Sequence, residues 1–134
     1  MNFKSSFCIK SDTRHLKPLR EWVGAVAGLL KGSGFPDLAL MPCSLALTEA
    51  VDNAIFHAHD GNPELPIVIS LKVSDSGIVM EVVDRGKGIE DIDTPEPDEM
   101  LNHGRGLFII RQLMSEIESF VSGGEHHLRM TYRI

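Results

Sequence analysis

The chain has 134 residues, of which 43% are hydrophobic and 24% charged, and its formal net charge is -6 at pH 7. This size predicts one domain, over residues 1–134, that buries roughly two-thirds of its unfolded surface. The negative charge argues against direct nucleic-acid binding and against binding to anionic membranes. No apolar run reaches the ~18 residues of a membrane span, and the first ten residues lack a signal peptide's apolar core, so we expect a cytoplasmic protein.

The first part of the chain predicts a strand and then a long amphipathic helix. Residues 2–9 alternate loosely between apolar and polar side chains, and from residue 13 to 31 the apolar side chains recur at spacings of three and four. Gly32 to Gly34 ends this helix. Its apolar stripe, which includes Trp22, is expected to lie in the core, and part of it could form a homodimer face. Cys8 and Cys43 show no CxxC spacing, so we expect two buried thiols.

A second helix is predicted from near Pro42 to the turn cluster at residues 60–63. On this helix Glu49, Asn53 and His57 follow one another at four-residue steps and drift only about 40° per step, so they share one face. A solvated polar face is the ordinary explanation of such a row. This row, however, has no Lys or Arg partner for ion pairs and places Asn inside a helix, which indicates a functional site. The apolar residues of the opposite face are Leu47, Val51, Ala54 and Ala58.

The remaining elements are a hairpin over residues 67–82, an acidic, proline-rich loop over 90–103, and a helix over 106–115. Two closing strands, 117–122 and 128–134, are joined by a pair of glycines. This order predicts a two-layer α/β sandwich whose mixed, mostly antiparallel sheet carries its helices on one face.

Asp84 ends the second strand of the hairpin and is followed by Gly86 and Gly88. In a regular strand Asp84 points to the same side as Met80 and Val82, which is the core side. A carboxylate there costs several kcal/mol unless a donor satisfies it. The exocyclic amine of adenine is a plausible donor, and the glycines would let the backbone approach a flat ring. An ordinary Asp-Gly turn is the alternative.

A second glycine motif, Gly104-Arg105-Gly106-Leu107, opens the helix that follows the acidic loop. Backbone N–H groups and the helix dipole favour phosphate at such a position, although helix capping would explain the glycines equally well. The motif is not a Walker A loop, because no Lys-Ser/Thr follows. It is not a Rossmann fingerprint either, because the third glycine and the preceding strand are missing.

The three motifs in this order resemble the Bergerat-fold ATP-binding domain of the GHKL superfamily, and the resemblance runs nearly end to end. More closely, residues 49–59, 84–88 and 104–117 are similar to the small bacterial anti-sigma-factor serine kinases. Proteins of that family bind sigma factors and phosphorylate anti-sigma antagonists. The resemblance therefore implies ATP and Mg²⁺ as cofactors, and a sigma factor and an antagonist as partners.

The resemblance also implies roles for individual residues. Asn53 would hold Mg²⁺ against the ATP phosphates, Glu49 would be the general base, and His57 would position the nucleotide. Asp84 would read adenine. The other implied nucleotide contacts are Gly86 and Gly88 at the ring and Gly104, Arg105, Gly106 and Leu107 at the phosphates, with residues 90–103 as the ATP lid.

Two features depart from the family pattern. Small relatives often place Thr near the start of the last strand, where residues 125–127 are Glu-His-His in this chain, so the adenine-side network is left open. The lid has six acidic and no basic residues, an awkward neighbour for a polyphosphate. Mg²⁺, Arg105 and Lys87 would have to offset that charge, or the acidic residues face a partner. The histidines at 15, 103, 126 and 127 are expected to have surface or packing roles.

Two other functions compete with a serine/threonine protein kinase. One is the catalytic fragment of a histidine kinase; residues 14–19 superficially match a phosphoacceptor box, but Leu16 stands where an acidic residue is expected after the histidine. The other is a nucleotide-dependent binding module without catalysis, against which the presence of Glu49 and Asn53 argues. The sequence does not identify the partner or the oligomeric state.

Overall fold

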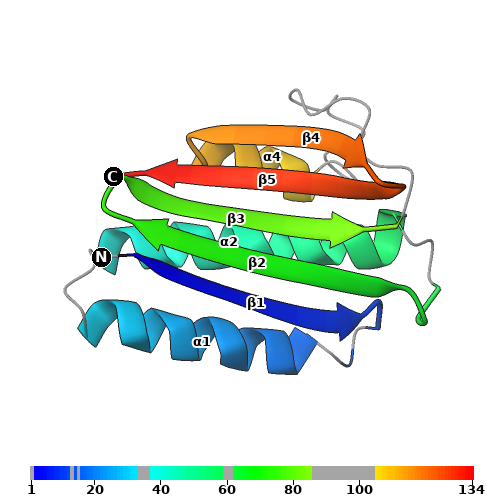
Figure 1. The fold of residues 1–134 in the computed structure, drawn as a ribbon, viewed down its shortest axis with the longest axis horizontal. Helices are drawn as coiled ribbons and strands as arrows, with labels where there is room; N and C mark the ends of the chain where they lie inside the picture. Colours follow the sequence, from blue (N-terminus) through cyan, green and yellow to red (C-terminus); the bar gives the residue numbers. More distant parts are fainter. Residues whose placement is uncertain (1, 13, 15, 33–36, 59–61, 86–104) are drawn as a thin grey trace.

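The computed structural model describes residues 2–12, 14, 16–32, 37–58, 62–85 and 105–134. Five strands form one sheet in the order β1-β2-β3-β5-β4, and the helices α1, α2 and α4 pack beside it (Figure 1). The elements are β1 (Phe3–Lys10), α1 (Leu16–Gly32), α2 (Asp37–Asn53), the π-helical turn η2 (Ala54–Ala58), β2 (Pro66–Ser74), β3 (Gly77–Asp84), α4 (Arg105–Leu113), β4 (Glu116–Ser122) and β5 (Glu125–Arg133).

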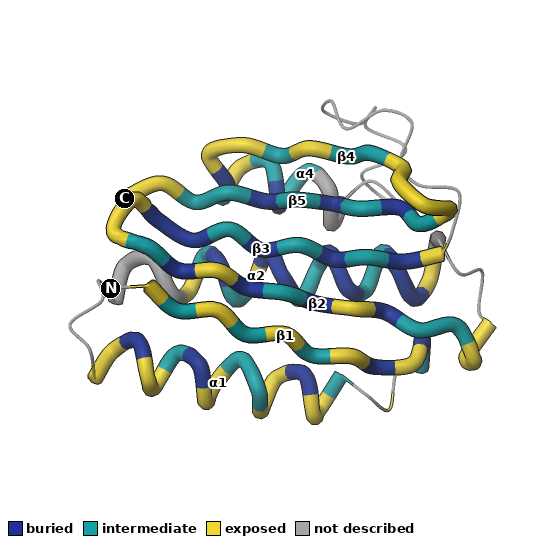
Figure 2. Tube along the Cα trace, in the orientation of Figure 1, coloured by how far each residue is buried: buried dark blue, intermediate teal, exposed yellow. Residues whose placement is uncertain are grey.

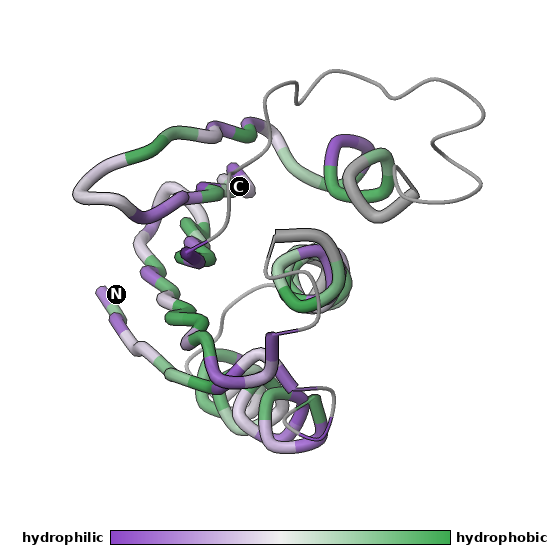
Figure 3. Tube along the Cα trace, turned by 90° about the vertical axis from the view of Figure 1, so that its right-hand side faces the viewer, coloured by the Kyte–Doolittle hydropathy of each residue, from purple (hydrophilic) through white to green (hydrophobic). Residues whose placement is uncertain are grey.

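The fold has two layers. Seen along the sheet, all three helices lie on one side of it (Figure 3). Each of the four described strand pairs is antiparallel, so the parallel component that a mixed sheet allows does not occur among the described strands. The predicted two-layer α/β sandwich is therefore confirmed. None of the helices in the described ranges combines the length and the hydropathy that a bilayer crossing requires.

The core lies between the inner face of the sheet and the helices. Strand β2 alternates strictly, so that Ile67, Ile69, Leu71 and Val73 are buried while the residues between them reach solvent (Figure 2). Helix α2 is the central helix and buries Leu47 and Val51 against this face, on the side of the helix that the sequence predicted. Trp22 of α1 stacks on Phe7 of β1 at a centroid distance of 5.4 Å, which confirms its packing role.

Three local predictions were wrong. Helix α2 begins at Asp37, not near Pro42, so the proline lies inside the helix and removes one backbone hydrogen bond there. Strand β5 begins at Glu125, three residues earlier than predicted, because the two-glycine turn leads directly into strand pairing between Ser122 and Glu125. Cys8 is exposed, because the alternation of β1 turns it to the outer face of the sheet, whereas Cys43 is buried as expected.

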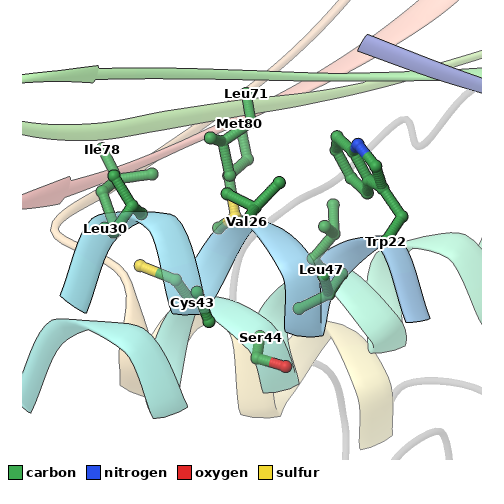
Figure 4. A pocket seen from close by; sticks show the side chains of 11 residues that line it. Trp22, Val26, Leu30, Cys43, Ser44, Leu47, Leu71, Ile78 and Met80 are labelled. Carbon is green, nitrogen blue, oxygen red and sulfur yellow. The ribbon is translucent and has the colours of Figure 1, made fainter. Parts of the chain in front are cut away.

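An apolar pocket of about 30 Å³ lies between α1, α2 and the sheet (Figure 4). Cys43 lines it together with Val26, Leu30, Leu47 and Met80. Burial raises the pKa of the Cys43 thiol to about 12, which makes it a poor nucleophile at neutral pH. The residues that line the pocket include none of those predicted to bind nucleotide. Its lining is mainly apolar, as in the surrounding core.

The turn from β2 to β3 depends on Gly77. Its φ is +147°, a conformation that side chains rarely adopt, and a Cβ at this position would lie 2.0 Å from the carbonyl oxygen of Tyr132 on β5. The carbonyl oxygen that this Cβ would meet belongs to the backbone of β5, which cannot move away without breaking the pairing of β3 with β5. Glycine is therefore the residue that allows the hairpin to join the sheet at this point.

We expect Gly77→Ala to lower the free energy of unfolding by more than about 2 kcal/mol. Gly24→Ala is the matched control, because Gly24 lies in α1 with nothing within 4 Å of the added Cβ. In that helix alanine should raise the free energy of unfolding by about 0.5–1 kcal/mol. Urea unfolding of both variants measures the two effects, and equal stabilities would contradict the steric account of the turn.

Candidate functional site

The described elements that carry predicted site residues end at one side of the molecule. The C-terminal ends of α2 and β3 and the start of α4 all lie toward the same end of the sheet (Figure 1). Helix α2 packs against α4 and contacts β3, and the turn η2 also contacts β3. The topology therefore brings together the end of α2 at Asn53, the end of β3 at Asp84 and the start of α4 at Arg105.

The polar row of the second helix is only partly a helical row. Glu49 and Asn53 are half-buried one turn apart on α2, as predicted. The α-helix ends at Asn53, however, and residues 54–58 form the π-helical turn η2. His57 lies in this turn, so the four-residue α-helical step does not apply to it, and its side chain lies outside the described part of the chain.

Asp84 faces the core, as its parity predicted. Its exposure is 4%, and it follows the buried residues Met80 and Val82 on the inner face of β3. A carboxylate in the core needs a hydrogen-bond donor, and the amine of adenine was the predicted donor. The structure places a hydrogen-bond partner from the protein itself at this point, because Nδ1 of His126 lies 3.2 Å from Oδ2 of Asp84.

His126 is a partner of Asp84 that sequence reasoning missed. It lies directly opposite Asp84 in the β3–β5 pairing and is 3% exposed. Its second ring nitrogen, Nε2, lies 2.7 Å from Oγ of Ser119 on β4. A signal was present, because the alternation that places Leu128 and Met130 in the core also places His126 there if the strand is extended toward the glycine turn.

The glycine motifs are described only in part. Gly86, Gly88 and Gly104 lie outside the described residues, as do all residues of the predicted lid. The backbone of residues 105–107 forms the first turn of α4, in agreement with the predicted helix start, while the side chains of Arg105 and Leu107 lie outside the description. The phosphate-binding roles of Gly104, Arg105, Gly106 and Leu107 therefore stay predictions.

The outer face of the sheet carries a separate cluster formed by Glu81, Phe120, His127 and Arg129. His127 stacks on Phe120 at 4.9 Å, and Arg129 lies over the same ring at 5.0 Å. Partial burial raises the pKa of Glu81, but hydrogen bonds from His127 and Arg129 outweigh it and leave the pKa below its ordinary value. These residues point away from Asp84, and the predicted surface or packing role of His127 is confirmed.

Asp52 lies between Glu49 and Asn53 in the sequence of α2, and one of its carboxylate oxygens is buried. This oxygen, Oδ1, has no hydrogen-bond partner within the described ranges. Burial raises the pKa of Asp52, and the charge of Arg20 on α1 opposes that shift only in part. The folded protein therefore binds a proton at Asp52 more tightly than the unfolded chain does, and the carboxylate disfavours folding once it is ionised.

We expect Asp52→Asn to be more stable than the original protein at pH 7. The stability that protonated Asp52 gives the folded protein is fully present below the ordinary pKa of 3.8. It is lost as the pH rises through the higher pKa of the folded state. The stability difference between the two proteins should therefore grow from pH 4 to pH 7. Urea unfolding across this range measures it, with Glu21→Gln, an exposed carboxylate on α1, as the control. A difference that shrinks as the pH rises would contradict the assignment.

The donor set at this end of the molecule suits a hard cation and a nucleotide. Asn53 offers an amide oxygen, which is a ligand of the kind that Mg²⁺ takes in proteins, usually together with substrate phosphates. Glu49 offers a carboxylate one turn earlier, which suits a general base. Asp84 offers a buried acceptor at the neighbouring strand end. The described residues therefore fit one ligand of Mg²⁺ and one hydrogen bond to a nucleotide base.

Comparison with known proteins places the chain in a family. Residues 9–132 match the model of the histidine kinase-like ATPase domain. The chain therefore belongs to this family, and its resemblance to the GHKL superfamily is confirmed.

Several characterised proteins are similar in sequence. Identity is 27% over 110 residues to the serine-protein kinase RsbW of Listeria monocytogenes serovar 1/2a, covering 75% of this chain and 70% of that protein. It is 34% over 79 residues to the anti-sigma F factor of Bacillus cytotoxicus, covering 54% of this chain and 53% of that protein. It is 36% over 80 residues to the anti-sigma F factor of Heyndrickxia coagulans, covering 54% of each. The chain thus matches only about half the length of the two anti-sigma F factors.

Two solved structures share the fold. The RsbU and RsbW domains of Rv1364c from Mycobacterium tuberculosis match 98% of this chain and 32% of that chain, with a TM-score of 0.68 and 18% identity. The histidine kinase domain of the Erythrobacter litoralis EL346 blue-light activated histidine kinase matches 86% of this chain and 60% of that chain, with a TM-score of 0.57 and 19% identity. At these identities the likeness concerns the fold alone.

Proposed function

We propose that this chain is an ATP-dependent serine/threonine protein kinase that phosphorylates an anti-sigma antagonist and also binds a sigma factor or a similar regulator. Kinase activity is supported at the level of the family, since a 27% identical relative is named a serine-protein kinase. The partners are suggested by the relatives named anti-sigma F factors. A single cytoplasmic domain over residues 1–134 is part of the same proposal.

One observation carries the nucleotide part of the proposal. Asp84 is a buried carboxylate at the end of a strand, and the helix that bears Glu49 and Asn53 ends beside that strand. Burial of a carboxylate is costly and is common where a site must accept a specific hydrogen bond. We assign Asp84 to the exocyclic amine of adenine, and Gly86 and Gly88 to the approach of the ring.

The chemistry assigned to the helix is phosphoryl transfer. Mg²⁺, held by Asn53, would supply positive charge that offsets the charge of the phosphates. A carboxylate oxygen of Glu49 takes the proton of the substrate hydroxyl while the hydroxyl oxygen bonds to the γ-phosphorus. The bond from that phosphorus to the bridging oxygen of ADP breaks, so the products are ADP and a phosphoserine or phosphothreonine. His57 is assigned to nucleotide positioning.

The test is incubation of the chain with Mg-ATP and candidate antagonist proteins, followed by mass analysis for phosphate. The proposal predicts an acid-stable phosphate on a serine or threonine of one antagonist, which is absent when the chain or Mg²⁺ is omitted. Glu49→Gln is the matched control for transfer by a contaminating kinase.

Other outcomes separate the competing functions. An acid-labile phosphate would indicate histidine phosphorylation and would favour a histidine-kinase fragment. ATP-dependent partner binding without any transfer would indicate a nucleotide-dependent binding module. Either result would contradict the serine/threonine kinase assignment.

A further inference from the structure

Three polar side chains form a hydrogen-bonded network across the inner face of the sheet. Asp84 on β3, His126 on β5 and Ser119 on β4 are linked in that order by contacts of 3.2 Å and 2.7 Å. The carboxylate and the imidazole are both almost completely buried. Burying a polar group costs free energy unless it is hydrogen-bonded, so the three side chains require a specific arrangement of protons.

The geometry favours one tautomer of the ring. Nδ1 of His126 faces a carboxylate, which only accepts hydrogen bonds when ionised, so Nδ1 carries the hydrogen and donates it to Oδ2 of Asp84. Nε2 then accepts the hydrogen of the Ser119 hydroxyl. Both ring nitrogens are thus engaged, and the orientation of the imidazole is fixed from two sides.

The fixed ring in turn fixes the carboxylate. A hydrogen bond to one oxygen sets the rotation of the carboxylate about its bond to Cβ, and with it the direction of the second oxygen. We propose that His126 is a positioning residue that holds Asp84 as the acceptor for the exocyclic amine of adenine, and that it thereby sets the preference of this chain for adenine nucleotides. This inference rests on the proposed function, because it assumes that ATP binds at Asp84.

The preference follows from what a carboxylate can accept. The amine at position 6 of adenine donates to it, whereas inosine nucleotides carry a carbonyl oxygen at that position and present a second acceptor. Two acceptors facing each other are repulsive, which lowers the affinity for the inosine nucleotide. A carboxylate that can rotate would avoid this clash, so the preference depends on groups that restrain the rotation, and His126 is one of them.

The experiment measures affinities for Mg-ATP and Mg-inosine triphosphate by calorimetry and compares their ratio between variants. His126→Leu removes the donor and should lower the preference for ATP about tenfold, while His126→Asn keeps a donor near the Nδ1 position and should stay within about threefold of the original ratio. His127→Leu is the matched control, since it removes the neighbouring histidine on the opposite face of the same strand. It should leave the ratio unchanged.

The ratio distinguishes positioning from a merely structural role. Partial unfolding of a variant lowers the apparent affinity for both nucleotides by the same factor, so the ratio of the two affinities does not change. If His126→Leu does not fold, Ser119→Ala decides, because loss of the hydroxyl loosens the ring and should lower the ratio about threefold.

Two results would overturn the inference. A folded His126→Leu protein that binds ATP with the original preference would refute the positioning role while leaving the proposed function intact. An unchanged ratio in Ser119→Ala would do the same if the leucine variant does not fold. If the original chain binds no ATP, the proposed function fails first, and the inference falls with it.

Discussion

Replacing Glu49 by glutamine is expected to leave Mg-ATP bound while phosphoryl transfer slows by roughly 10²-fold or more. Glutamine has nearly the same shape as glutamate but cannot take the proton of the substrate hydroxyl. Single-turnover transfer to the cognate antagonist, with nucleotide affinity measured in the same buffer, gives both quantities. Because phosphoryl transfer depends heavily on positioning and electrostatics, a smaller loss would mean that the base contributes less than assigned. Wild-type transfer by Glu49→Gln would remove the general-base role.

Asn53→Ala should show the opposite defect, with loss of Mg-dependent ATP affinity. The two residues lie one turn apart on α2, so a general disturbance of the helix would affect both in the same way. Asp52→Asn is the matched control, since it changes the neighbouring side chain but belongs to neither assigned role, and it should keep Mg-ATP affinity. If Asn53→Ala binds Mg-ATP as tightly as the original protein, the polar row is an ordinary helix face.

Asp84→Asn is expected to weaken ATP binding by about 10²-fold and to lower the free energy of unfolding by no more than about 1 kcal/mol. The asparagine oxygen can still accept the hydrogen bond from His126, so the fold loses little. Its amide group, however, would present a donor to the amine of adenine, which is also a donor. Calorimetry and urea unfolding of the same preparation measure the two effects.

The structure offers a closely matched control for this variant. Glu81 is a carboxylate on the same strand that also pairs with a histidine of β5, but it lies on the outer face of the sheet. Glu81→Gln should therefore leave ATP affinity unchanged. If a folded Asp84→Asn protein binds ATP with full affinity, or if Glu81→Gln loses affinity equally, Asp84 does not contact the nucleotide.

Much of the fold could be predicted from the sequence because the local patterns were unambiguous. The alternation of Ile67, Ile69, Leu71 and Val73 can only place one face of a strand in the core. The same parity predicted that Asp84 would be buried, and the structure confirms this. The two glycines at 123 and 124 predicted a tight turn, and both have the positive φ that such a turn requires.

The errors arose where local signals competed with tertiary structure. Pro42 reads as a helix start, but packing of α2 against the sheet and α4 compensates for the hydrogen bond that the proline removes. The partner of Asp84 was missed because Glu125-His126-His127 was not taken as strand, since histidine and glutamate are weak strand formers. The register of β5 with β3 places His126 opposite Asp84. This register is set by pairing between strands and cannot be predicted from one segment alone.

A crystal structure with Mg²⁺ and a non-hydrolysable ATP analogue would test the nucleotide site most directly. The account predicts that the amine of adenine lies within hydrogen-bonding distance, about 2.7–3.2 Å, of the Asp84 carboxylate while His126 keeps its contact with Oδ2. It also predicts that the metal is bound by the amide oxygen of Asn53. An adenine ring that lies elsewhere, with Asp84 in contact with His126 but not with the nucleotide, would contradict the account.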